Sequence, residues 1–180
     1  VGVMVDGQVD VPRAKLLERI DGSRICVEYG RPMIDGRQIF GPQAVVPFQQ
    51  IWRTGADMAT TFATERADLF GSRRLPRGTY SLYTRPGEKH WEVIFNNQTG
   101  QWGSVHVPKR DVLMVTATTV QMKTPREQFT IFLNDLRSST DGGALTLEWE
   151  HESVRIPFTV TKSVAGKPIE FGAACAADRP

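Results

Sequence analysis

Apolar and polar residues alternate along much of the chain with the period of two that is typical of a β-strand. The alternation is cleanest over residues 128–133, 144–150 and 153–160, where every second residue is apolar. Because successive side chains of a strand point to opposite faces, each of these stretches presents one apolar face to a core. Further strands are expected at residues 13–20, 23–29, 59–64, 67–70, 79–84, 90–95 and 111–121.

Turn signals separate these stretches. Asp21-Gly22 tolerates the positive φ angles of a two-residue hairpin turn, and Gly71-Ser72, Pro86-Gly87 and Asp141-Gly142-Gly143 mark other turns. About nine short strands without a convincing 3.6-residue period predict an all-β fold, either an antiparallel β-sandwich or a partly closed barrel. Helices should be few and short, with residues 47–53 and 125–128 as the candidates.

Two long irregular loops interrupt the strands, at residues 30–56 and 96–110, where Gly and Pro recur without any lasting period. Loops of such length in a compact domain commonly carry function. We expect residues 1–12 to form an irregular arm, residues 13–160 to form the β-sandwich, and residues 161–180 to form an extended tail.

Composition and charge argue against nucleic acid as a partner and against a membrane-spanning segment. The 180 residues contain 22 Lys and Arg against 20 Asp and Glu, and the resulting formal charge of +2 is too small to capture nucleic acid. No apolar run approaches the ~20 residues that a membrane-spanning helix needs. The sequence therefore predicts a globular domain with no transmembrane segment, which could still lie against a membrane.

The motifs of common catalytic and metal sites are absent from the sequence, including the Gly-x-Ser-x-Gly elbow, His-Glu-x-x-His and Cys-x-x-Cys. His90, His106 and His151 lack the spacing of metal ligands, so we expect no metal and no cofactor. A hydrolase that uses a carboxylate such as Asp57 or Glu92 with a nearby His is the enzymatic alternative.

The tryptophans divide by context. Trp91 and Trp149 lie on apolar faces of predicted strands and are expected in the core, whereas Trp52 and Trp102 lie in the irregular loops.

Arginines accompany the loop tryptophans. If the loops meet, then Arg31, Arg37, Trp52, Arg53, Thr54 and Trp102 would line a pocket for a carboxylate, phosphate or sugar. The alternative is that the arginines tie the long loop down, for example Arg53 to Asp57, while the tryptophans cap the sandwich.

Two cysteines, Cys26 in a predicted strand and Cys175 in the tail, permit one disulfide or two free thiols. A bond between them would join the tail to the second strand. The chain opens on Val1 rather than Met, for which the removal of an export signal and simple trimming are both explanations.

A set of sequence blocks resembles one bacterial family. The blocks are Tyr29-Gly30-Arg31-Pro32, Trp52-Arg53-Thr54-Gly55-Ala56, Gly78-Thr79-Tyr80-Ser81-Leu82 and Gln101-Trp102-Gly103, within a resemblance that spans about residues 12–158. They are similar to the DUF2911 family of domains of unknown function. The resemblance implies an exported protein, periplasmic or extracellular, and supplies no catalytic residue to carry over. The tail from about Thr161 onward departs from the family pattern.

These observations leave three functional hypotheses. The first is a non-enzymatic accessory subunit that docks on a protein partner or a larger, membrane-associated complex through its arms. Its docking residues would be the apolar and proline side chains of the tail, Val164, Pro168, Ile169 and Phe171. The second is a binder of a small anionic ligand or carbohydrate in the Arg and Trp pocket. The third is the carboxylate hydrolase.

Overall fold

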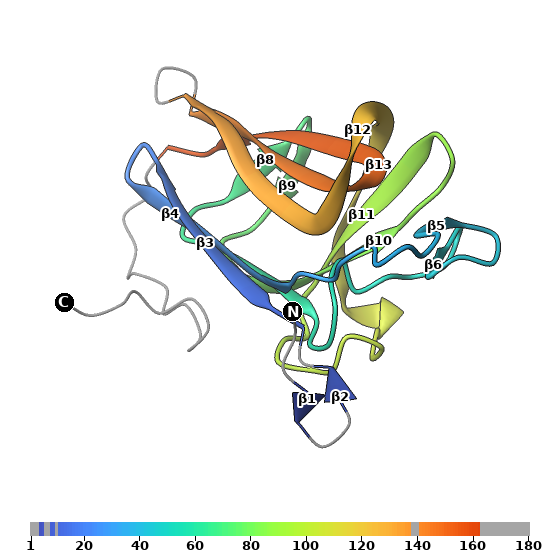
Figure 1. The fold of residues 1–180 in the computed structure, drawn as a ribbon. Coiled ribbons are helices and arrows are strands. Elements are labelled where there is room, and N and C mark those ends of the chain that lie inside the picture. Colours follow the sequence, from blue (N-terminus) through green and yellow to red (C-terminus); the bar gives the residue numbers. More distant parts are fainter. Residues whose placement is uncertain (1–3, 6–7, 10, 138–140, 163–180) are drawn as a thin grey trace.

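The fold is a single antiparallel sheet of nine strands, which bends so that its two halves face each other (Figure 1). The computed structural model describes residues 4–5, 8–9, 11–137 and 141–162. In sheet order the strands are β3 (Arg13–Ile20), β4 (Ser23–Gly30), β7 (Thr60–Thr64), β10 (Gly78–Arg85), β11 (His90–Asn96), β12 (Asp111–Arg137), β13 (Gly142–Val160), β8 (Asp68–Phe70) and β9 (Arg73–Leu75).

Minor elements complete the described structure. β1 (Met4–Val5) and β2 (Gln8–Val9) form a short antiparallel pair within the predicted N-terminal arm, and β5 (Phe40–Gly41) and β6 (Val46–Pro47) pair in parallel within the first irregular loop. The one helix of the described ranges is a 3₁₀ turn, Pro108–Arg110. No helix in these ranges is long and apolar enough to cross a membrane. The all-β sandwich is confirmed, and the sheet does not close into a barrel.

Two long strands carry the chain from one layer of the sandwich to the other. The first part of β12 pairs with β11, and its later part pairs with β13. The layers meet through aromatic side chains, since Tyr29 of β4 lies 5.6 Å from Phe129 of β12, and Phe70 of β8 lies 5.1 Å from Phe95 of β11. Edge and tilted ring contacts of this kind hold aromatic cores together.

A change of phase within β13 is visible in the sequence and explained by the structure. The inward residues are Leu145, Leu147 and Trp149 in the first half, but Val154 and Ile156 in the second half, so the apolar face moves from odd to even positions. Glu150 lies between them with a positive φ of 52°, and the register with β12 shifts around it. Such an irregularity bends a strand while its pairing continues.

The structure corrects the predicted number of strands in this part of the chain. Residues 111–121 and 128–133 were expected as separate strands but belong to one strand, β12. Likewise, residues 144–150 and 153–160 are the two halves of β13. Alternation reveals where a strand lies but not whether a bulge joins it to the next.

The two predicted helices are wrong. Residues 125–128 lie inside β12. Within residues 47–53, Pro47 belongs to β6, and Trp52 exchanges two main-chain hydrogen bonds with Thr84 of β10, at 2.8 and 2.9 Å. Pairing with strands distant in sequence outweighs the weak local preference for a helix.

Local turn chemistry and the tryptophan core are as predicted. Asp21 and Gly22 have positive φ angles of 46° and 75° between β3 and β4. Trp91 and Trp149 are each 2% exposed within the main core. Both predictions rest on the few neighbouring residues in the sequence, and such local patterns are enough to predict a turn or the buried face of a strand.

The first irregular loop closes on itself where Gly30 meets Ala56. A Cβ added to Gly30 would overlap the carbonyl group of Ala56. Only glycine allows main chain to approach main chain this closely. The two ends of the loop are thereby brought together.

A buried carboxyl group lies in β8, away from this loop. Asp68 is fully buried, its Oδ1 accepts a hydrogen bond from Thr64 Oγ1 at 3.2 Å, and its Oδ2 has no partner. Burial raises the pKa of this carboxyl from 3.8 to about 8, which outweighs the lowering by Thr64. The raised pKa favours the protonated form of Asp68 in the folded protein at neutral pH.

Gly30→Ala is expected to lower the free energy of unfolding by at least about 3 kcal/mol or to prevent folding, because the new methyl group displaces the Ala56 main chain. Gly100→Ala is the reference, since that position has a positive φ of 80° and open space around it and should lose only about 1 kcal/mol. Urea unfolding followed by tryptophan fluorescence measures both. Equal losses would contradict a close approach at Gly30.

Asp68 should make stability fall as pH rises. Between its ordinary pKa of 3.8 and about 8, the folded protein holds a proton that the unfolded chain has released, so raising the pH favours unfolding. Asp68→Asn removes the titration and should flatten the dependence of the unfolding free energy on pH. Asp135→Asn, at an exposed aspartate paired with Arg155, is the control. An unchanged slope in Asp68→Asn would refute the assignment.

Candidate ligand-binding cavity

A cavity of about 770 Å³ lies between the first irregular loop and the adjoining parts of β12 and β13. Its charged lining residues are Arg31, Asp35, Arg37, Arg53 and Asp57. The remaining wall comes from Val11, Pro12, Pro32, Met33, Val45, Val46, Trp52, Gly55, Ala56, Gln128 and Trp149. The wall therefore combines guanidinium and carboxylate groups with a largely apolar surface, as is common for small-molecule sites.

Main-chain pairing with β12 positions the first side of the cavity. The amide of Phe129 donates to the carbonyl of Pro32 at 2.9 Å, and the amide of Ile34 donates to the carbonyl of Glu127 at 2.9 Å. Glu127 also accepts a hydrogen bond from the amide of Asp35 at 3.0 Å. The loop is thus attached to β12 like a short extra strand, which holds Arg31 and Arg37 at the rim.

The three arginines of the cavity are held by neutral oxygen atoms. Arg31 donates to the Phe129 carbonyl at 3.2 Å and to Thr130 Oγ1 at 3.0 Å. Arg37 donates to the carbonyls of Ile34, at 3.0 Å, and Met33, and Arg53 donates to the Asp57 carbonyl at 3.3 Å.

None of these three guanidinium groups has a carboxylate within 4.0 Å among the residues that the structure describes. A guanidinium carries five N–H donors in a planar fork, of which these contacts use one or two. The arginines are therefore oriented by the loop, as one alternative anticipated, while their charge and several donors remain available to a ligand.

Aromatic rings form the floor of the cavity. Trp52 stacks on Trp149 with ring centroids 5.6 Å apart and planes 18° from parallel, and Phe129 lies 5.0 Å from Trp52. Both indole N–H groups are satisfied, by the carbonyls of Gly55 at 3.1 Å and Glu127 at 3.3 Å. Trp52 is 9% exposed and Trp149 only 2%, so the rings present little of their faces. They make a rigid apolar floor.

The structure brings together four of the six residues predicted for the pocket: Arg31, Arg37, Trp52 and Arg53. Thr54 is fully buried behind the wall, where its hydroxyl lies 3.2 Å from Thr84 Oγ1. Trp102 is 44% exposed and lies outside the lining.

The two irregular loops do meet, as the pocket hypothesis required. Gly103 of the second loop lies against Arg53 of the first. Just beyond the first loop, Met58 pairs with Trp102, and the amide of Gly103 donates to the Asp57 carbonyl at 2.9 Å. Their meeting supports the wall behind Arg53, since a Cβ on Gly103 would overlap the Arg53 side chain. The second loop therefore contributes packing to the cavity, not its own tryptophan.

Sequence reasoning missed Asp35 and Gln128 as lining residues. Gln128 reaches the site because its Nε2 donates to the Arg31 carbonyl at 3.2 Å, a contact between residues 97 positions apart in the chain. No local pattern signals such a contact. Asp35 precedes Gly36 in a turn, and its place at the rim depends on the same pairing with β12.

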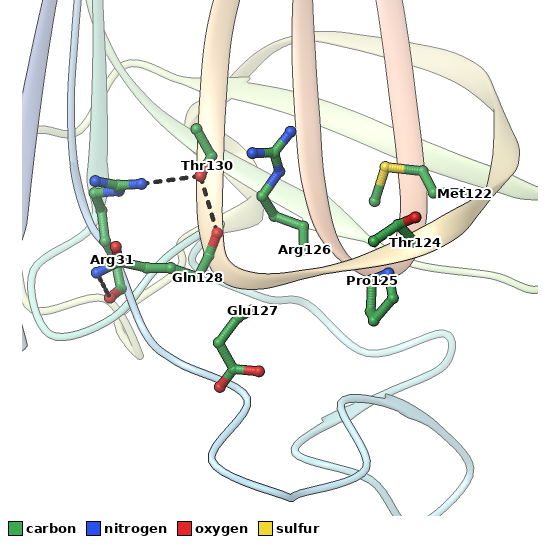
Figure 2. A pocket seen from close by; sticks show the side chains of 8 residues that line it. All are labelled: Arg31, Met122, Thr124, Pro125, Arg126, Glu127, Gln128 and Thr130. Atoms are coloured by element: carbon green, nitrogen blue, oxygen red, sulfur yellow. Dashed lines mark hydrogen bonds between the residues drawn. The ribbon is translucent and has the colours of Figure 1, made fainter.

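A second cavity, of about 470 Å³, shares Arg31 and Gln128 with the first (Figure 2). Its remaining lining residues are Met122, Thr124, Pro125, Arg126, Glu127 and Thr130. Figure 2 shows the Arg31 guanidinium directed toward Thr130 from the loop. Arg126 is already paired with Glu148, with the closest atoms 2.7 Å apart. Arg31 is thus the cation that the two cavities share.

The hydrolase residues do not converge. Asp57 lines the main cavity, but no histidine lines either cavity. Glu92 forms an ion pair with Arg85, and His106 pairs with Asp111 at 2.9 Å on the outer face of β10. Within the described ranges, no group of three or more His, Cys, Asp and Glu side chains is placed to hold a metal ion.

The predicted disulfide and the predicted docking residues involve the tail, residues 161–180. Cys26 is fully buried in β4. Cys175, its predicted partner, lies outside the described residues, so the pairing of these two cysteines stays a prediction. Val164, Pro168, Ile169 and Phe171, predicted for docking, also lie outside the described residues.

Comparison with known proteins gives one match. No curated protein and no solved structure matches the chain. The family described as "Protein of unknown function (DUF2911)" matches residues 11–158, which include every strand from β3 to β12, most of β13 and all the lining of both cavities. On the extent of that match, the chain is a member of the DUF2911 family.

Proposed function

We propose that this protein binds a small anionic ligand, carrying a carboxylate or phosphate group, in the main cavity. The observation that carries the proposal is the set of three guanidinium groups, those of Arg31, Arg37 and Arg53, that line one cavity. Within the described part of the chain, their hydrogen bonds go to carbonyl and hydroxyl oxygens. Guanidinium forks match carboxylate and phosphate groups in a bidentate geometry.

The charge of the wall favours an anion. Three arginines against Asp35 and Asp57 leave a net charge of +1, three minus two. A charge that is partly withdrawn from water attracts a counter-charge more strongly than one in bulk solvent. The apolar part of the lining, which includes Met33, Val45 and Val46, would receive the apolar body of the ligand, and an acidic sugar satisfies both requirements.

The other hypotheses have less support. The accessory-subunit role was inferred from the arms, whose predicted docking residues lie outside the described part of the chain, and it stays a prediction. The hydrolase hypothesis pairs a carboxylate with a histidine, and no histidine lines the cavity beside Asp57. An exported, periplasmic or extracellular location also stays a prediction, and a binding role for the cavity is compatible with it.

Ligand binding is expected to depend on Arg37 and Arg53. Titration calorimetry of the whole protein with phosphate, citrate, glucuronate and glucose should give binding for at least one anion and none for glucose. Arg37→Gln and Arg53→Gln should each weaken that binding by about tenfold, because each removes a charge-assisted hydrogen bond. Added salt should weaken it as well.

Arg155→Gln provides the matched control, since it removes a guanidinium group that is paired with Asp135 and does not line the cavity. It should leave the affinity unchanged. Unfolding midpoints of all variants establish that the fold is retained. Flat titrations of the unmodified protein with all three anions would overturn the proposal, as would an equal effect of Arg155→Gln.

A further inference from the structure

Three apolar side chains of the second irregular loop are exposed. Trp102 and Val105 are each 44% exposed and Val107 is 37% exposed, and we call these three residues the Trp102 ridge. Large aromatic and branched side chains that gather on one exposed loop commonly mark a surface for interaction. The ridge lies outside the lining of the two cavities described above.

The main chain of the ridge is held in place, so its exposure is a feature of the fold. The Tyr83 hydroxyl of β10 donates to the Val105 carbonyl at 2.7 Å, and Asn96 Nδ2 donates to the Val107 carbonyl at 3.0 Å. Tyr83 and Asn96 are both fully buried. A surface that is fixed before binding loses little conformational freedom on binding.

Charge on the same loop has one sign. The exposed pair Lys109 and Arg110 follows the ridge directly, and residues 96–110 contain no Asp or Glu. The acidic side chain that follows, Asp111, is engaged by His106 at 2.9 Å and by Asn96 at 2.8 Å. The loop thus offers aromatic and aliphatic groups beside two cations.

We propose that the Trp102 ridge attaches this protein to the surface of a membrane that contains anionic lipid. Trp102 and the two valines would enter the boundary between headgroups and acyl chains, a position that tryptophan favours, while Lys109 and Arg110 contact lipid phosphates. Charge complementarity selects this occupant, because a loop with cations and no free carboxylate fits an anionic lipid surface. The attachment is peripheral and reversible, and it is separate from the proposed ligand binding.

The test is co-sedimentation of the whole protein with vesicles of phosphatidylcholine, with and without phosphatidylglycerol. Binding is expected with phosphatidylglycerol and is expected to be at least tenfold weaker without it. Trp102 emission should shift to shorter wavelength on binding. The shift is specific to Trp102, because the other three tryptophans are at most 9% exposed.

Two variants and one control separate the contribution of Trp102 to vesicle binding from that of Lys109 and Arg110. Trp102→Ser should reduce vesicle binding by at least tenfold, and Lys109→Gln with Arg110→Gln should abolish the preference for phosphatidylglycerol. Val120→Ser, at a 61% exposed valine of β12, should change neither. Absence of binding to the anionic vesicles overturns the proposal. An equal effect of Val120→Ser overturns it too, as does self-association in lipid-free solution that Trp102→Ser abolishes, which would assign the ridge to a second copy of the chain.

Discussion

Main-chain hydrogen bonds between residues 32–34 and residues 127–129 hold the first irregular loop against the bend of β12. They attach the start of the loop to β12, while Trp52 near its end stacks on Trp149 of β13 in the cavity floor. They also align Arg31 so that its side chain reaches Phe129 and Thr130. The position of Arg31 therefore depends on this pairing, which resembles the addition of a short strand to the sheet, whereas Trp52 is positioned by its pairing with Thr84 of β10.

The electrostatic character of the cavity follows from the way its arginines are held. A guanidinium group anchored by a carboxylate loses much of its field, whereas one anchored by carbonyl dipoles keeps its net charge. Elsewhere in the described chain, arginines are commonly anchored by carboxylates, as in Arg24 with Glu65 and Arg66 with Asp21. Arg31, Arg37 and Arg53 are instead anchored by neutral oxygens, so that each guanidinium group has a fixed orientation and keeps its charge available.

Much of the fold could be predicted because its signals are local. Period-two alternation located the strands, and Asp21-Gly22 marked a hairpin turn that the structure contains. The continuity of β12 and β13 was not predictable, because bulges interrupt the pattern without ending the pairing. The helix expected at residues 47–53 failed for a related reason, since Trp52 is paired with Thr84.

For the candidate site, sequence reasoning identified the residue types and not their arrangement. Arg31, Arg37, Trp52 and Arg53 share one loop, so their proximity could be anticipated. Gln128 and Trp149 join them through contacts that span about a hundred positions, which no local pattern encodes. Trp102 was assigned to the pocket on the condition that the two loops meet; they do, but Trp102 is not part of the cavity lining.

The positive φ at Glu150 constrains how many residues can separate the two halves of β13. Because it moves the apolar face of β13 from odd to even positions, the number of residues between Trp149 and Val154 is fixed by the core on both sides. The loss of a single residue there would turn Val154, Ile156 and Phe158 toward solvent. Relatives of this protein should therefore vary in length at the tips of their surface loops, and keep this short interval constant even where its side chains differ.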